Sequence, residues 1–135
     1  MIDPDAMIIA DSSVWIDYFN GERTREADFL DDLLRRDFIL MGDLILTEIL
    51  QGFDRDADFR HAKRLLDRLD CAEMVGYDLA LASAANYRRL RKIGITVRKT
   101  IDVIIATFCI KHSHVLLHSD RDFDRMREPL SLVTL

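Results

Sequence analysis

The chain is poor in cysteine, proline and glycine: among its 135 residues are 2 cysteines, 2 prolines and 5 glycines. Cys71 and Cys109 form neither a CxxC pair nor a Cys/His cluster, so we expect reduced core residues of a cytoplasmic protein. No apolar run is long enough to cross a bilayer, and we expect no secretion signal. Neither GxxxxGKS/T nor GxGxxG occurs, which argues against the common nucleotide-binding folds.

The composition is that of a globular protein, with 49% hydrophobic residues. We predict a flexible leader, or an extension from an upstream start codon, over residues 1–6 and a single domain over residues 7–135. The net charge of −5 argues against a protein that coats nucleic acid. Basic residues still gather near one another, either as a solvated helix face or as a contact surface for a polyanion: Arg88, Arg89, Arg91, Lys92, Arg98 and Lys99.

Residues 7–21 have the pattern of a buried strand, a tight turn and a helix. The apolar run 7–10 is typical of a parallel strand covered on both faces, and Asp11 ends it. Ser12 or Ser13 can cap the helix that follows. Open α/β sheets bind ligands at the carboxyl ends of their strands, so Asp11 is a candidate site residue, although an acid at a helix start can also be a simple cap.

Short apolar segments alternate with helical patterns along the rest of the chain. We predict strands over residues 38–41, 72–75, 115–117 and 130–133, and helices over residues 22–36, 44–52 (capped by Asp43), 59–69, 77–93, 100–112 and 121–127, with Pro129 stopping the last. This alternation predicts an α/β fold with a mainly parallel sheet of about five strands and helices on both faces. A doubly wound order 3-2-1-4-5 places the first and fourth strands side by side.

In that order, three more acids are expected at the same sheet edge as Asp11. Asp120 follows the fourth strand, Asp102 lies in the first turn of an almost wholly apolar helix, and Glu48 lies beside the apolar face of another helix. Taken singly, each could be an exposed residue or an acid favoured by a helix dipole. Two carboxylates about 4 Å apart repel by about 4 kcal/mol at an effective dielectric near 20. Four such groups therefore predict a hard cation, Mg²⁺ or Mn²⁺, and metal-assisted phosphodiester chemistry.

Other metal ligands are less well supported by the spacing. Asp122, two residues beyond Asp120, is given a secondary role, as a direct or water-mediated metal ligand. His112, His114 and His118 suggest zinc, but they lie on both sides of a predicted strand and lack an obvious fourth ligand.

Four segments, in order, resemble the PIN domain, in particular VapC-type toxins of toxin–antitoxin pairs: DSSVWIDYFNG at Asp11, LTEILQGF at Glu48, RKTIDVIIATFCI at Asp102 and LLHSDRDFD at Asp120. The resemblance implies a PIN-like three-layer α/β/α sandwich and a Mg²⁺- or Mn²⁺-dependent endoribonuclease. These four acids would be its catalytic and metal-binding residues.

The same resemblance implies further roles and partners. Ser13 would orient a ligand or a water, and Arg98 would contact RNA or an antitoxin. The protein would be a homodimer neutralised by a VapB-type antitoxin, with a toxin–antitoxin hetero-oligomer as the assembled form and no membrane association.

Three other hypotheses remain open. A PIN-type nuclease of RNA maturation would have the same site without a toxin role. A phosphoaspartate receiver domain also gathers acids at strand ends, but it expects paired acids after the first strand and a late lysine, and no lysine follows Lys111. A catalytically silent binding partner is disfavoured by the complete set of acids.

Overall fold

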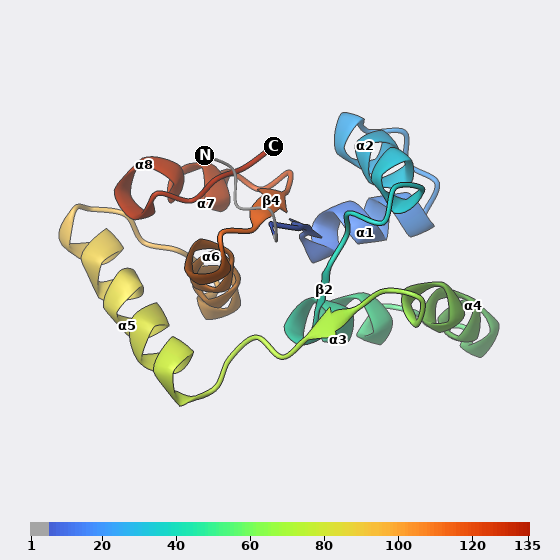
Figure 1. Cartoon of the computed structure of the whole chain (residues 1–135), viewed down its shortest axis with the longest axis horizontal. Helices are drawn as coiled ribbons and strands as arrows, with labels where there is room; N and C mark the ends of the chain where they lie inside the picture. The colour runs from blue at the N-terminus through green and yellow to red at the C-terminus, as the bar shows by residue number, and fades with distance from the viewer. Residues whose placement is uncertain (1–5) are drawn as a thin grey trace.

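Two parallel strands lie at the centre of the computed structural model, which describes residues 6–135. They are β1 (Ile8–Ala10) and β4 (Val115–Leu117), paired in register along their whole length. Both are continuously apolar and largely buried, as expected for strands covered on two faces. The first and fourth strands are therefore neighbours, as predicted (Figure 1).

A second parallel pair extends the sheet on the far side of β1. It consists of β2 (Met41–Gly42) and β3 (Cys71–Ala72), and a parallel bridge between Ile8 and Ile39 joins the segment before β2 to β1. Met74 packs directly on Gly42 of β2, because a Cβ at this position would overlap the sulfur of Met74 and require that side chain to shift.

The C-terminal segment lies on the other side of β4, where a parallel bridge joins Leu116 to Thr134. The spatial order of the segments is thus the predicted 3-2-1-4-5.

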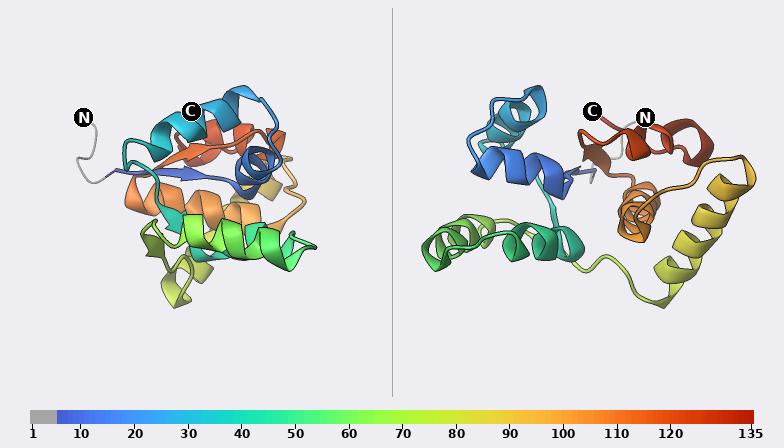
Figure 2. Two further views of the ribbon diagram at one scale, coloured as in Figure 1. Left: turned by 90° about the vertical axis from the view of Figure 1, so that its right-hand side faces the viewer. Right: turned by 180° about the vertical axis from the view of Figure 1, so that it is seen from behind.

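Helices lie on both sides of these strands (Figure 2). α1 packs on α2, and α5 packs on α6. No helix within residues 6–135 is long and apolar enough to cross a membrane. The helices are α1 (Ser12–Phe19), α2 (Arg25–Leu34), α3 (Asp43–Gln51), α4 (Asp56–Leu66), α5 (Tyr77–Lys92), α6 (Thr100–His112), α7 (Arg121–Asp124) and α8 (Arg127–Leu130).

The position of α6 in the core explains why this helix is apolar on nearly every side. α6 lies between the central strands and α5, so it is covered all round and not along one stripe. Ile105, Ala106 and Cys109 on α6 are fully buried, together with Trp15 of α1 and Leu116 of β4. Asp102 is the one acid on this helix, and it is buried as well.

Two predicted helix caps are wrong. Asp11, and not Ser12 or Ser13, caps α1, because its carboxylate accepts hydrogen bonds from Ser13. Gly42 occupies the cap position of α3. Asp43 is instead the first residue of α3, and its Oδ1 also accepts the N–H of Met74 at 3.0 Å, which ties the segment after β3 to the helix.

The C-terminal prediction also needs correction. The predicted strand over residues 130–133 is reduced to the single bridge at Thr134, since Leu130 still belongs to α8 and Ser131 has a left-handed conformation with φ of 62°. The predicted helix over residues 121–127 is split into α7 and α8. Pro129 lies within α8 and does not stop a helix, because proline is tolerated in a first turn, where its missing N–H costs nothing.

The remaining differences are small. The second and third strands are shorter than predicted and displaced from residues 38–41 and 72–75. α2 is shorter than the predicted helix over residues 22–36, and α4 begins and ends three residues earlier than the predicted helix over residues 59–69. Cys71 and Cys109 are both free, but Cys71 is exposed and is not a core residue. The leader predicted over residues 1–6 lies, apart from Ala6, outside the described residues.

Candidate active site

The four predicted acids come from four different elements. Asp11 follows β1, Glu48 lies on α3, Asp102 lies on α6, and Asp120 follows β4. Because β1 and β4 are parallel neighbours, the residues that follow them emerge at one edge of the sheet. The charges of the other three acids all raise the pKa of Asp102, which shows that the structure brings the four together.

Asp11 is held by the start of the helix that follows it. Its side chain is buried, and its Oδ2 accepts the Ser13 hydroxyl at 2.8 Å and the Ser13 N–H at 3.4 Å. The hydroxyl of Ser119, after β4, lies 3.4 Å from that of Ser13. Ser13 therefore fixes one oxygen of Asp11, while Oδ1 is buried and has no hydrogen-bond partner among the described residues.

Burial strongly perturbs Asp102. The pKa of its carboxyl is raised from 3.8 to about 7, first by burial and then by the charges of Asp11 and Asp120, while Lys99 opposes the rise. Its Oδ2 is buried without a hydrogen-bond partner in the described part of the chain. A carboxylate in these surroundings is costly to ionise unless a cation compensates it.

Glu48 shows the same pattern more weakly. Its pKa is raised by burial and by the charge of Asp11, and lowered by a hydrogen bond with the Ser12 side chain and by the charge of Lys99. Its Oε1 is a third buried carboxylate oxygen that finds no partner within residues 6–135. Ser12 and Lys99 were not predicted as site residues, since neither a lone hydroxyl nor a lone lysine stands out in the sequence.

Asp120 is less buried, with 24% of its side chain exposed. It caps α7, and its Oδ1 accepts the N–H of Asp122 at 2.9 Å. Its own N–H donates to Nδ1 of His118 at 3.1 Å. From the sequence His118 was predicted only as a possible zinc ligand, although a histidine two residues before an acid in a tight turn could have suggested this contact.

Asp122 faces two arginines. Its Oδ2 lies 3.4 Å from Nε of Arg98, and its Oδ1 lies 3.7 Å from a terminal nitrogen of Arg125. Its predicted secondary role as a metal ligand stays a prediction, but both oxygens already face cations. Arg98 is 75% exposed, and another of its nitrogens lies 3.9 Å from Oδ1 of Asp120, so this guanidinium stands at the rim of the acidic site.

A divalent cation fits the donor set. Three buried carboxylate oxygens without partners among the described residues, one each on Asp11, Glu48 and Asp102, are hard anionic ligands of the kind that Mg²⁺ and Mn²⁺ prefer. Within residues 6–135, no three Asp, Glu, His or Cys side chains are already grouped closely enough to hold a metal ion. Binding an ion here therefore requires the carboxylates to draw together.

The three histidines do not form a zinc site. His112 and His114 stack on each other near the start of β4, with ring centroids 5.9 Å apart, and Nδ1 of His114 accepts the N–H of Met7. His118 lies at the opposite end of that strand.

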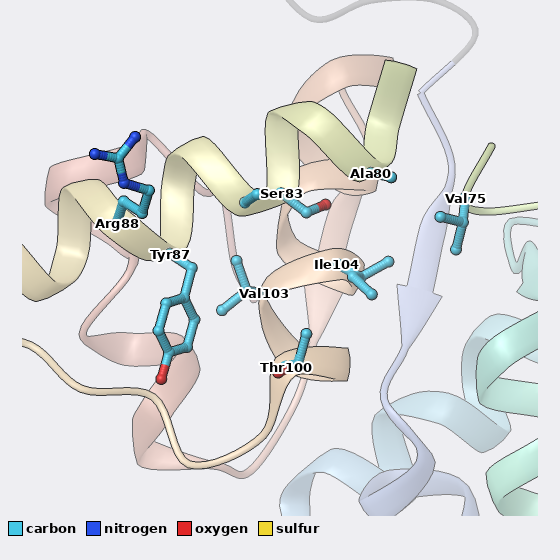
Figure 3. Close-up of a pocket in the computed structure, with 9 residues that line it drawn as sticks. Val75, Ala80, Ser83, Tyr87, Arg88, Thr100, Val103 and Ile104 are labelled. Atoms are coloured by element: carbon cyan, nitrogen blue, oxygen red, sulfur yellow. The ribbon is translucent and has the colours of Figure 1, made fainter. Parts of the chain in front are cut away.

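An apolar cavity of about 430 Å³ lies between α5 and α6 (Figure 3). Ala80, Tyr87, Val103 and Ile104 are among its lining residues. None of the four acids lines it, so it is distinct from the candidate active site.

Comparison with known proteins gives consistent results. The model of the PIN domain family matches residues 8–129. The chain is 33% identical over 120 residues to VapC ribonuclease Mb1587 of Mycobacterium bovis, which covers 87% of this chain and 90% of the relative. Ribonuclease VapC11 of Mycobacterium tuberculosis has the same identity and coverage.

Solved structures resemble the fold at lower identity. DNA-bound VapBC from Salmonella typhimurium matches with a TM-score of 0.77 and 14% identity, over 96% of this chain and 97% of that one. VapBC2 from Rickettsia felis, bound to a promoter DNA fragment, matches with a TM-score of 0.76 at the same identity and coverage.

Proposed function

Because the chain belongs to the PIN-domain family, we propose that it is a Mg²⁺- or Mn²⁺-dependent endoribonuclease and the toxin of a toxin–antitoxin pair. One observation supports the metal dependence: Asp11, Glu48 and Asp102 lie close together, and each has a buried carboxylate oxygen that finds no hydrogen-bond partner within residues 6–135. The names of the 33% identical relatives, which are VapC ribonucleases, support the substrate class.

In this proposal Asp11, Glu48, Asp102 and Asp120 hold the ion. A bound Mg²⁺ or Mn²⁺ supplies a water of lowered pKa and positive charge beside the scissile phosphate. Ser13 keeps Asp11 oriented through its 2.8 Å hydrogen bond. Lys99 lowers the cost of ionising Asp102 and Glu48, which must both be deprotonated to act as ligands.

Arg98 is the residue best placed to meet the RNA. It is exposed at the rim of an acidic site that would otherwise repel a polyanion. Its guanidinium is oriented by Asp122, and it can pair with a phosphate as the substrate approaches. The exposed arginines of α5, Arg88, Arg89 and Arg91, are a second candidate contact for the RNA backbone.

We further propose a VapB-type antitoxin as partner, a homodimeric toxin and a cytoplasmic location. The two solved structures named above are VapBC complexes, which supports the partner class. Co-expression with the product of a neighbouring small gene, followed by co-purification and loss of nuclease activity, would support the toxin role. A nuclease that purifies active and without such a partner would instead indicate a function in RNA maturation.

A cleavage assay on total cellular RNA tests the nuclease. It compares the wild type, Asp11→Asn and Asp102→Asn with Mg²⁺, Mn²⁺ or EDTA. Asp54→Asn, at an exposed position, is the matched control. Metal-dependent cleavage that only the two site variants lose supports the proposal. Equal cleavage by all four proteins would indicate a contaminating nuclease, and a folded, partner-free wild type that cuts no RNA would refute the proposal.

A further inference from the structure

We propose that His118 is a positioning residue for Asp120, acting through the backbone of the turn that joins β4 to α7. Its catalytic meaning depends on the proposed nuclease function. His118 directly follows β4 and is only 6% exposed. Its Nδ1 accepts the N–H of Asp120 at 3.1 Å, so the ring closes a short local loop around Ser119.

The ring is itself held from the other side. It packs against the buried ring of Phe123, with centroids 5.2 Å apart, and its Nε2 lies 3.5 Å from a carboxylate oxygen of Asp124. Nδ1 accepts a hydrogen bond while Nε2 faces Asp124, so both ring nitrogens have a partner. The imidazole thus connects the end of β4 to α7 and cannot turn without breaking these contacts.

This arrangement determines where the Asp120 carboxylate points. The backbone N–H of Asp120 is fixed by His118, and its Oδ1 is fixed by the N–H of Asp122. Within residues 6–135 the hydrogen bond and the ion pair of this carboxylate both involve Oδ1, so Oδ2 is the oxygen available to a ligand. Residues that orient a metal-binding side chain in this way typically alter metal affinity or activity 10- to 100-fold when they are replaced.

Two substitutions separate the hydrogen bond from the packing. His118→Phe keeps an aromatic ring against Phe123 but removes the acceptor for the Asp120 N–H. His118→Asn loses the ring but places a carbonyl oxygen near the position of Nδ1. A role in packing alone predicts that Phe is the milder change, whereas a positioning role predicts that Asn is.

Three measurements on the purified full chain distinguish these roles. Amide hydrogen exchange at Asp120 without metal reports the hydrogen bond, titration calorimetry with Mn²⁺ reports the site, and kcat and KM on an RNA substrate report catalysis. For His118→Phe we expect exchange at Asp120 to be at least tenfold faster, Mn²⁺ affinity to be about tenfold lower and kcat to fall with little change in KM. His118→Asn recovers most of the affinity and kcat, although it lowers Tm. His61→Phe, at an exposed position on α4, is the control and leaves all three unchanged.

The proposal is overturned if His118→Phe keeps wild-type exchange and Mn²⁺ affinity, or if His118→Asn is impaired as much as His118→Phe. Should the Phe variant not fold, His118→Gln serves instead, because its amide lies one carbon farther out and misses the Asp120 N–H. A wild type that neither binds Mn²⁺ nor cleaves RNA would refute the proposed function. The exchange rate at Asp120 would still decide whether His118 holds that amide.

Discussion

Replacing Asp102 by asparagine should stabilise the metal-free protein at neutral and alkaline pH. Folding raises the pKa of this carboxyl from 3.8 to about 7, mainly by burial. That difference corresponds to about 4 kcal/mol of unfavourable free energy when the group is ionised in the folded chain. The amide has nearly the same shape and carries no charge, so we expect the free energy of unfolding to rise by about 2–4 kcal/mol at pH 8.

The pH dependence of this gain identifies its cause. Near pH 4 Asp102 remains protonated in the folded state and is roughly half ionised in the unfolded state, so the variant and the wild type should differ by less than about 1 kcal/mol. As pH rises toward 7, the unfolded chain releases this proton while the folded chain retains it, and the wild type loses stability relative to the variant. Above about pH 7 both states of the wild type are ionised and the difference becomes constant.

Urea unfolding in EDTA from pH 4 to 8.5 measures this difference, with Asp54→Asn as the control. Adding Mn²⁺ should then reverse the order of stability, because the wild type gains a ligand that the variant holds poorly. A variant that is no more stable than the wild type at pH 8 without metal would refute the electrostatic reasoning. So would a gain in stability that does not change with pH.

Four further outcomes follow from the same contacts. Mn²⁺ affinity of the wild type should fall about tenfold per pH unit below about 7, because binding displaces the Asp102 proton; titration calorimetry that finds no pH dependence contradicts this. Glu48→Gln should abolish cleavage yet slightly stabilise the metal-free protein at pH 8, since burial raises the pKa of Glu48; a lower Tm in EDTA would be the contrary result. Arg98→Ala should raise KM for RNA and reduce its salt dependence while leaving Mn²⁺ binding nearly intact, and an unchanged salt slope would argue against a phosphate contact. Ser13→Ala removes the 2.8 Å hydrogen bond to Asp11 and should weaken Mn²⁺ binding about tenfold with little loss of stability, whereas unaltered affinity would show that Asp11 needs no such support.

The parts of the fold that were predicted correctly are those with strong local signals. β1, β4 and α6 are almost continuously apolar and end at a polar residue, so their positions could be predicted to within a residue. β2 and the C-terminal strand were misplaced because one or two residues of pairing leave no periodicity. Their backbone hydrogen bonds depend on where the neighbouring strand happens to lie.

The candidate site divides in the same way. The four acids could be identified because three of them interrupt apolar sequence and the fourth, Asp120, follows an apolar strand, and parallel strand order then brings them to one edge. Their surroundings could not be identified. The pairing of Asp122 with Arg98 and Arg125, and the contact of His118 with the Asp120 amide, require distances that sequence spacing does not give.

The amino-acid sequence alone therefore determines the chemistry available to this protein. Hydrophobic periodicity determines which segments are buried, and an acid that interrupts such a segment is costly to bury in ionised form unless a partner or a cation compensates its charge. Tertiary structure decides how those acids behave. The pKa of Asp102 rises to about 7 only because packing removes water from it and because β1, α3 and β4 bring three more carboxylates near. Desolvation and charge repulsion act through space, so they depend on the folded arrangement and not on position along the chain.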